Sequence, residues 1–263
     1  MKKLTLLLIL NFFTLFGYAQ TIEAKYQITY GSLLNLGVAT STLQIEGKKY
    51  KIKVEAKTTG MAKYLTNNRV EIYESFGIIK NNTFIPQKHI KTKIDDKTKR
   101  VKTYTFDYEK EKVFVHVMKS GFETIFNDKF QIEDIAIKKE SSSTLDYFAK
   151  NDLLSLFFNI KDKLQTFETG KEYTLKAVGA NKTKGVINIS MPNEKKRQEL
   201  NEYLETNDKI KFTAYINQKI FQSSKGELLI ALNSHGFCSY SVLKDVILFG
   251  DIVGKMIDFR IKG

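Results

Sequence analysis

Alternation of apolar and polar residues is the dominant pattern along most of the chain. The segment 49–57 alternates without a break, and charged residues occupy every second position from Lys49 to Lys57. A period of two places successive side chains on opposite faces of a strand, and one apolar face beside one charged face is typical of an antiparallel sheet with a solvated side. The apolar face of this segment consists of Tyr50, Ile52, Val54 and Ala56.

The same alternation recurs from one end of the chain to the other. It predicts further strands within residues 25–30, 42–46, 103–108, 209–214 and 257–262. Turn-forming pairs separate the runs at hairpin-like spacing, since Gly, Asn and Asp adopt turn conformations at little cost. The predicted turns lie at Glu46-Gly47, Asn81-Asn82, Asp95-Asp96 and Ser120-Gly121. Ten or more strands are expected.

Two stretches change to the helical period. Residues 144–164 carry a broad apolar stripe, which Leu154 and Phe158 widen, and such a face has to be covered by the sheet. The stretch either continues as one helix or breaks at Asn151-Asp152, because either residue can cap a second segment. The stripe itself consists of Leu145, Phe148, Leu153, Leu156, Phe157, Ile160 and Leu164.

A second helix is expected over residues 194–205. Its only apolar strip is formed by Leu200, Tyr203 and Leu204, so it should be a short surface helix between two strands. A single helical turn is expected at 61–65. The predicted fold class is therefore mainly β: an antiparallel, strongly curved sheet or incomplete barrel covered by one apolar helix, with a second short surface helix.

The first nineteen residues have the pattern of a signal peptide. Lys2 and Lys3 precede a short apolar run, and Gly17-Tyr18-Ala19 places small residues at the −3 and −1 positions of a cleavage after Ala19. An uncleaved N-terminal anchor is the alternative, although the run is shorter than the roughly 20 residues of a spanning helix. We expect a signal peptide over 1–19, a single β-rich domain over 20–263 and localisation in the periplasm.

Charge and cysteine content change this picture only in part. The formal net charge is +13, or +11 without the two N-terminal lysines. After export, an anionic membrane surface or another envelope protein is a more plausible partner than nucleic acid, and a lysine-rich solubilising surface is the alternative. The single cysteine, Cys238, excludes an intramolecular disulfide, so the core alone must stabilise the fold.

No motif in the sequence indicates catalysis or a cofactor. The glycine-rich phosphate and dinucleotide motifs and the serine hydrolase motif are absent. His89, His116 and His235 are the only histidines, and His116 is expected to be an ordinary strand residue. His235 and Cys238 form an H-x-x-C pair, but zinc requires three or four ligands. The preferred interpretation is a turn at Gly236 that holds a small buried cysteine, in a protein that is not an enzyme.

What remains is a broad apolar sheet face and a very apolar helix. Either this surface is simply the core, or part of it lines a cavity for an acyl chain or lipid, as in small barrels and curved sheets with a helical cover. The first function expected is therefore a binding or carrier protein for an apolar envelope molecule. The alternative is a structural or assembly partner of another envelope protein. The residues expected to bind the ligand are Leu153, Leu154, Phe157 and Phe158.

Several segments together resemble the domain of unknown function 3108 family. The resemblance spans most of the chain after residue 19. It implies a secreted or periplasmic β-rich bacterial protein with no assigned activity, whose sheet is broadly similar to the incomplete barrels of lipid-binding lipoprotein carriers and lipocalins. The family supplies no catalytic residues, and the charged excursion at 194–205 departs from its pattern. The segments that carry the resemblance are 56–65, Asn68-Arg69, 73–77, Phe84-Ile85-Pro86, 104–108 with Asp107, 152–158 and 225–228.

Overall fold

The computed structural model describes residues 19–30, 34–126, 131–180, 184–215, 226–246 and 250–263. The signal-peptide prediction falls on residues 1–18, outside this part of the chain, and Ala19 is the first residue of strand β1. None of the helices within the described ranges is both long and apolar enough to cross a membrane.

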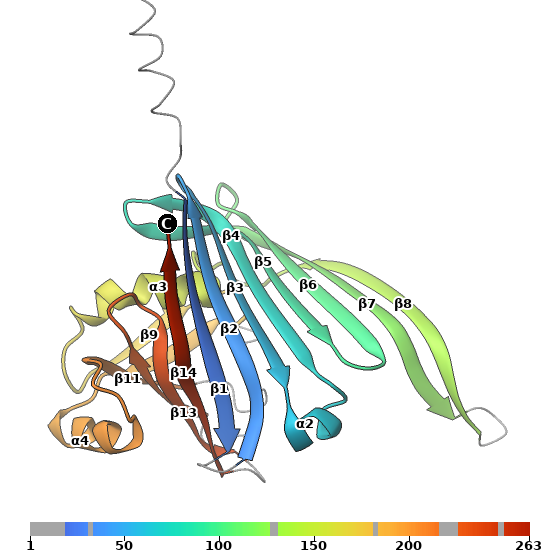
Figure 1. Ribbon diagram of the computed structural model, residues 1–263. Helices are drawn as coiled ribbons and strands as arrows, with labels where there is room; N and C mark the ends of the chain where they lie inside the picture. The colour runs from blue at the N-terminus through green and yellow to red at the C-terminus, as the bar shows by residue number, and fades with distance from the viewer. Residues whose placement is uncertain (1–18, 31–33, 127–130, 181–183, 216–225, 247–249) are drawn as a thin grey trace, which may run out of the picture.

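The described chain is mainly β and forms one antiparallel sheet of fourteen strands (Figure 1). The sheet is not closed into a barrel, because β8 and β9 are its two edges. Its order is β8-β7-β6-β5-β4-β3-β2-β1-β14-β13-β12-β11-β10-β9. The first eight strands are β1 Ala19–Tyr30, β2 Leu34–Glu46, β3 Lys49–Thr58, β4 Val70–Lys80, β5 Thr83–Ile94, β6 Thr98–Asp107, β7 Lys112–Phe126 and β8 Ile132–Thr144. The last six are β9 Glu172–Lys176, β10 Val186–Ser190, β11 Ile210–Tyr215, β12 Glu227–Leu232, β13 Cys238–Val246 and β14 Gly250–Lys262.

Three helices are described: α2 Gly60–Leu65, α3 Leu153–Leu164 and α4 Glu194–Tyr203. The prediction of one helix from residue 144 is wrong for its first part. Residues up to Thr144 continue β8, which pairs with β7, and the chain from Leu145 to Ala149 packs without helical structure against Tyr104 and Phe106. The alternative break at Asn151-Asp152 is confirmed, because Asp152 caps α3.

One predicted turn is also wrong. Ser120-Gly121 lies inside the fifteen-residue strand β7, which pairs with β6 and β8 on either side. Gly121 has a φ of 128°, and a Cβ added there would lie 2.0 Å from the backbone oxygen of Lys97. The glycine therefore allows the backbones of two neighbouring segments to approach closely, and it does not mark a reversal of the chain.

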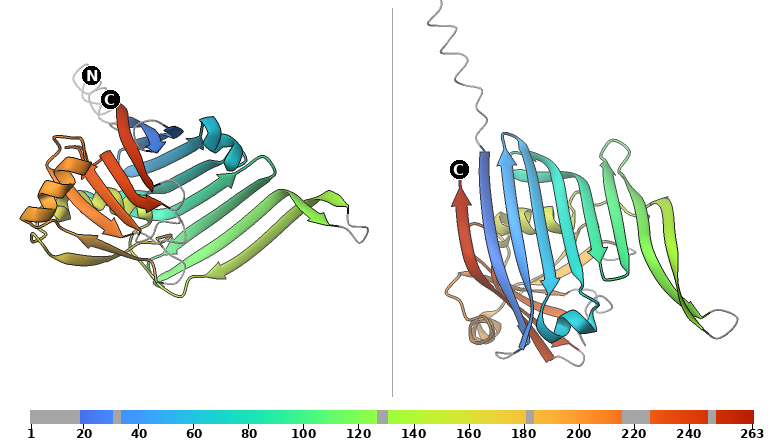
Figure 2. Two further views of the ribbon diagram at one scale, coloured as in Figure 1. Left: turned by 90° about the horizontal axis from the view of Figure 1, so that it is seen from below. Right: turned by 45° about the vertical axis from the view of Figure 1, so that its right-hand side comes forward.

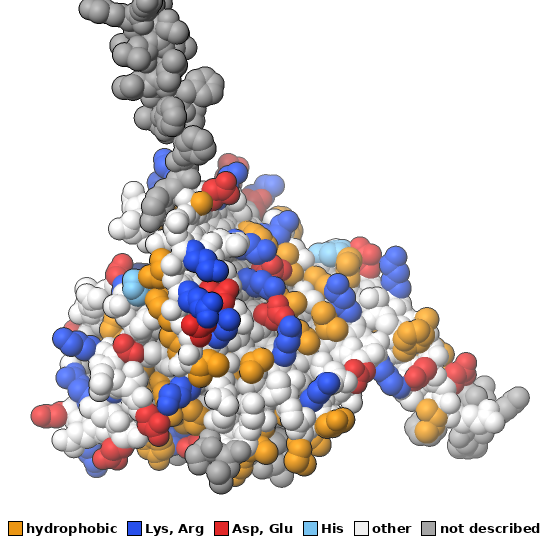
Figure 3. All heavy atoms as spheres, in the orientation of Figure 1, with side chains coloured by type: hydrophobic (Ala, Val, Ile, Leu, Met, Phe, Trp, Pro, Cys, Tyr) orange, Lys and Arg blue, Asp and Glu red, His pale blue; other side chains and the backbone are white. Residues whose placement is uncertain are grey.

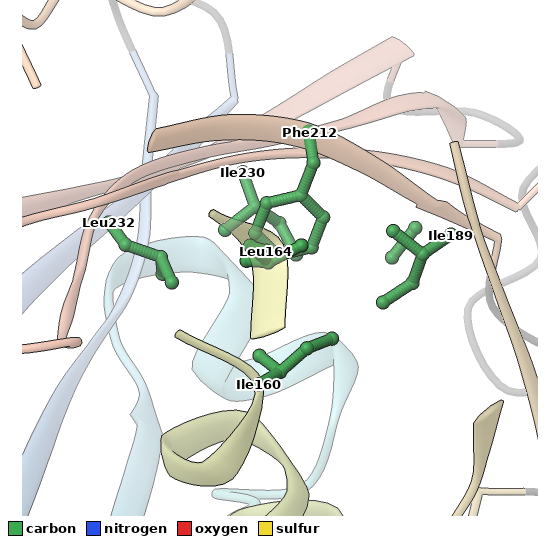
Figure 4. Close-up of a cluster of buried hydrophobic side chains, with 7 residues drawn as sticks. Ile160, Leu164, Ile189, Phe212, Ile230 and Leu232 are labelled. Carbon is green, nitrogen blue, oxygen red and sulfur yellow. The ribbon is translucent and has the colours of Figure 1, made fainter. Parts of the chain in front are cut away.

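Helix α3 contacts two separate parts of the sheet. On one side Ile160 and Leu164 pack with buried residues of β10 to β12, including Phe212 and Ile230 (Figure 4). On the other side Leu154 and Phe158 join a cluster from β1 to β3. Figure 2 shows α3 lying between these two groups of strands.

Helix α4 packs on different sheet residues. Its Leu200, and Leu204 directly after it, are fully buried against Leu229, Ala231 and neighbouring residues. The short charged helix is thus held by the narrow apolar strip that the sequence showed. Over the face in view in Figure 3, Lys and Arg side chains are interspersed with Asp and Glu.

Candidate functional site

An apolar pocket of about 230 Å³ lies between α3 and the sheet. All four residues predicted to bind a ligand line it, and they contribute its helical wall. They form two adjacent pairs in the first half of α3, Leu153-Leu154 and Phe157-Phe158. Both edges of the apolar stripe of the helix therefore reach the pocket. The complete lining is Tyr26, Ser41, Val54, Leu153, Leu154, Phe157, Phe158, Phe237 and Cys238.

Asp152 fixes the position at which α3 begins. Its Oδ1 accepts hydrogen bonds from the backbone N–H of Leu154 at 2.8 Å and of Ser155 at 2.9 Å, while the Ser155 hydroxyl contacts the Asp152 N–H in return. This reciprocal arrangement is a capping box. Farther along the helix, Asn159 bonds both the N–H and the carbonyl of Phe84 at 2.8 Å. Helix α3 is therefore tied to β5 by polar contacts as well as by packing.

Asp152 also belongs to a fully buried polar cluster. The Ser75 hydroxyl donates to its Oδ2 at 2.5 Å and lies 3.0 Å from the Tyr50 hydroxyl. His89 is paired with Ser75 in the β4–β5 register, and its Nδ1 lies 2.8 Å from the carbonyl oxygen of Glu74. A carbonyl only accepts, so Nδ1 carries the proton. Burial lowers the pKa of His89 despite the nearby Asp152, which keeps the ring neutral at pH 7.

The cluster explains how distant segments of the sequence come together. Ser75 lies in segment 73–77, and Asp152 in segment 152–158. Tyr108 lies in segment 104–108, and its hydroxyl donates to the carbonyl oxygen of Pro86 at 2.6 Å. Four of the segments that carried the family resemblance, 73–77, 84–86, 104–108 and 152–158, therefore meet around the N-terminus of α3. The sequence does not predict this cluster, because Ser75, His89 and Asp152 lie far apart along the chain and no local pattern connects them.

Three polar groups lie on the wall of the otherwise apolar pocket. They belong to the lining residues Tyr26 and Ser41, which carry hydroxyls, and Cys238, which carries a thiol. The thiol lies 3.4 Å from the carbonyl oxygen of Tyr240, and burial raises its pKa to about 12. Burial likewise raises the pKa of Tyr26. A thiol that stays protonated is a weak nucleophile, so these groups are suited to orient a ligand rather than to attack it.

The remaining histidines lie away from the pocket wall. His116 is in β7, as predicted, with Nδ1 3.1 Å from the Ser142 hydroxyl and Nε2 3.3 Å from a carboxylate oxygen of Glu140. The His235 ring lies 5.3 Å from the Phe259 ring. Within the described ranges, no three His, Cys, Asp or Glu side chains are grouped as a metal site requires.

A larger hollow of about 1030 Å³ lies beside α4. Most of its lining is polar or charged, and Lys211 already donates there to Asn201 and to the carbonyl oxygen of Thr206. Pockets that bind small molecules are lined mainly by apolar side chains, and this hollow is not. The pocket at α3 is therefore the better candidate site.

Comparison with known proteins connects the chain to one family. Residues 25–136 match the family described as Protein of unknown function (DUF3108), which confirms the resemblance found in the sequence. Neither the curated proteins nor the solved structures gave a match. The matched range begins within β1, contains β2 to β7 and ends within β8, and thus includes Ser75 and His89 but not α3.

Proposed function

We propose that this chain, whose residues 25–136 belong to the DUF3108 family, is a non-enzymatic periplasmic protein that binds or carries an apolar envelope molecule such as a lipid or acyl chain. In this proposal the sheet curves strongly around the pocket and α3 covers it. The observation that carries the proposal is the pocket itself, whose helical wall is formed by Leu153, Leu154, Phe157 and Phe158.

The size of the pocket limits what it can hold. At about 230 Å³ it is smaller than the roughly 300–1,000 Å³ of most ligand pockets. It therefore suits one acyl chain or part of one, rather than a whole two-chain lipid. Each buried CH₂ contributes about 0.8 kcal/mol, so even a partly buried ten-carbon chain stabilises the folded state measurably.

Phe158 is the position that tests the proposal most directly. Its ring contacts Phe84 and Phe237, with centroids 5.7 and 5.0 Å away, and also borders the pocket. Emptying a fully packed core aromatic costs about 3–5 kcal/mol. We expect Phe158→Ala to cost less, because open space already adjoins the ring, and to reduce the thermal shift given by decanoic acid. Urea unfolding and melting curves measure the two effects.

Phe212 provides the matched control. It is 2 % exposed, packs in the cluster of Figure 4 and does not line the pocket. Phe212→Ala should cost the full amount and leave the ligand-induced shift unchanged. The carrier proposal is overturned if neither fatty acids, phospholipids nor isoprenoids raise the wild-type melting temperature and lipid extraction of the native protein yields nothing.

The export part of the proposal has its own test. The pattern from Lys2 to Ala19 leads us to expect mature protein that begins at Gln20 in a periplasmic fraction. N-terminal sequencing of that fraction measures this directly. Protein that keeps Met1 and stays in the cytoplasm contradicts it.

A second candidate, a partner of another envelope protein, is favoured by edge strand β8. This thirteen-residue strand is exposed along almost its whole length and pairs on one side only, with β7. Such an edge is a template to which another chain can add a strand. Ile135→Pro should abolish such pairing without affecting lipid binding, as measured by cross-linking and by thermal shift.

A further inference from the structure

Four basic side chains are grouped on the sheet face that carries the polar cluster. In the β5–β6 register Lys91 pairs with Lys102, and Lys93 pairs with Arg100. His89 pairs with Tyr104 in the same register, and alternation along both strands puts all these residues on one face. We call Lys91, Lys93, Arg100 and Lys102 the basic grid.

Like charges on directly paired residues of neighbouring strands repel each other, so both pairs destabilise the β5–β6 pairing. Several cations elsewhere in the sheet contact carboxylates, as in the contacts of Lys51 with Glu74 at 3.1 Å and of Lys119 with Glu123 at 2.6 Å. Within the described part of the chain, no salt bridge includes any residue of the basic grid, and Lys91 instead donates to the carbonyl oxygen of Gly179 at 2.7 Å.

The carboxylates that act on Lys91 already have other partners. Glu71 accepts a hydrogen bond from the Tyr73 hydroxyl at 2.7 Å, and Asp152 accepts one from Ser75. Burial together with the Lys102 charge lowers the pKa of Lys91 to about 8. Burial and the Arg100 charge lower the pKa of Lys102 in the same way. Glu71 is also the direct cross-strand partner of Lys93, so one carboxylate faces the four cations from β4. The grid still carries excess positive charge that an anion would relieve.

The grid and the pocket lie on the same row of the sheet. Val54, which lines the pocket, pairs with Tyr73, and Tyr73 pairs with Lys91. At a spacing of about 4.8 Å between strands, Lys91 is roughly 10 Å from Val54 and Lys102 roughly 14 Å. The Tyr73 ring between them has the Lys91 ammonium 5.4 Å from its centroid. On this row only Tyr73 separates Val54 from Lys91, so the head group of an acyl chain seated in the pocket would lie within reach of the grid.

We infer that the basic grid binds the anionic head group, a carboxylate or phosphate, of a single-chain amphiphile whose acyl chain occupies the pocket. The inference rests on the proposed carrier function and narrows its ligand to anionic amphiphiles. A neutral molecule of the same chain length leaves the repulsion within the grid in place.

Binding of decanoate, decyl phosphate and decanol tests the inference at low ionic strength. Because a hydrogen bond to a charged group contributes about 1.5–3 kcal/mol, we expect both anions to bind at least about tenfold more tightly than decanol. In Arg100→Gln/Lys102→Gln the anions should lose that advantage while decanol affinity stays unchanged. Lys93→Gln/Arg100→Gln is a second variant if the first fails to fold. Isothermal titration calorimetry measures all three ligands.

Lys88→Gln/Lys99→Gln is the matched control. These lysines lie on the same two strands but alternate to the opposite face, so the net charge falls equally and the preference for anions should remain. Equal affinity for decanol and decanoate in the wild type overturns the grid inference and leaves the carrier function standing. Binding of none of the three ligands overturns the grid inference, and the carrier function falls with it if phospholipids and isoprenoids also leave the melting temperature unchanged and lipid extraction yields nothing. Inorganic phosphate that binds as tightly as decyl phosphate shows a free-anion site and overturns the link to the pocket.

Stability gives an independent measurement. If the grid were only structural, Lys102→Gln would lower the melting temperature of the ligand-free protein. If the grid is an anion-binding site, Lys102→Gln removes one repelling charge and should leave the melting temperature of the ligand-free protein unchanged or raise it. The same variant should reduce the shift in melting temperature that decanoate causes. A lowered melting temperature with an undiminished decanoate shift contradicts the inference.

Discussion

Asp152 shows how much one residue contributes to this fold. It caps α3, accepts the Ser75 hydroxyl and is fully buried, so it connects the helix to β4 inside the protein. The sequence predicted Asn151 or Asp152 as a cap, because short polar residues before an apolar stripe favour that role. It could not predict the Ser75 contact, because the two residues are separated by 77 positions and no local pattern encodes such a pairing.

Replacement of Asp152 should therefore cost more than an ordinary cap. We expect Asp152→Ala to lower the free energy of unfolding by about 2–4 kcal/mol, of which roughly 1 is the lost cap and roughly 1–3 the hydroxyl left unsatisfied. Asn193→Ala is the control, since Asn193 caps α4 through Lys196 N–H at an exposed site and should cost only about 1 kcal/mol. A double-mutant cycle with Ser75→Ala isolates the coupling, and additive losses would contradict it.

Lys91 makes a prediction about pH. Its pKa in the folded state is about 8, below the ordinary 10.5, because burial and then Lys102 disfavour the charge, while Asp152 and Glu71 oppose that effect. Below pH 8 both states are protonated and the penalty on folding is complete. As the pH rises from 8 towards 10.5 the folded state loses its proton first, so the penalty disappears and stability increases.

Urea unfolding of wild type and Lys91→Gln between pH 7.5 and 9.5 measures this effect. The stability advantage of the variant should shrink as the pH rises. Cys238 contributes the opposite slope above about pH 9, because its raised pKa favours folding only while the unfolded thiol stays protonated. That contribution is common to both proteins and cancels in their difference. A difference that does not change with pH contradicts the assigned cause.

At the scale of elements, period-two alternation predicted strands well where a strand has one buried and one wetter face. In β3, Tyr50 and Ile52 are buried as expected. The prediction from periodicity failed where the same apolar spacing fits both a helix and an irregular segment. Residues 145–149 have helical spacing, yet they lie between β8 and the Asp152 cap and pack as irregular chain. Periodicity over so few residues cannot distinguish a helix from a chain that turns past a sheet.

Gly121 shows a similar ambiguity, because a glycine in the sequence can mark either a turn or a close approach of two backbones within a strand. Substitution of this glycine distinguishes the two roles. We expect Gly121→Ala to destabilise the protein by more than about 2 kcal/mol, because its Cβ would meet the Lys97 oxygen and its φ of 128° is unfavourable for alanine. Gly47→Ala is the control: it lies in a true turn with φ of 57° and no atom within 4 Å, so only the conformational cost remains. Equal losses in urea unfolding would contradict the close-approach explanation.

At the scale of the whole molecule, the antiparallel sheet could be predicted, but its open edges and strand order could not. Strands β1 to β8 follow one another both in sequence and in space, as hairpin signals suggest. The pairing of β1 with β14, and the position of α3 between two parts of the sheet, depend on contacts between opposite ends of the chain. The predicted ligand residues reached one pocket because they belong to a single helix, whereas the basic grid emerges only from cross-strand register.

The β1–β14 pairing also has a consequence for how the chain reaches its native state. Among the described strands β1 is synthesised first and its neighbour β14 last, so Ile22 meets Ile261 only after β14 has been made. Until then one side of β1 has unpaired backbone groups, while β2 to β8 can form through local hairpins. Contacts of such long sequence separation slow folding and expose intermediates to aggregation. The completion of this sheet therefore waits until β14 has been synthesised, and a chaperone that holds the chain until β14 emerges would raise the yield of folded protein.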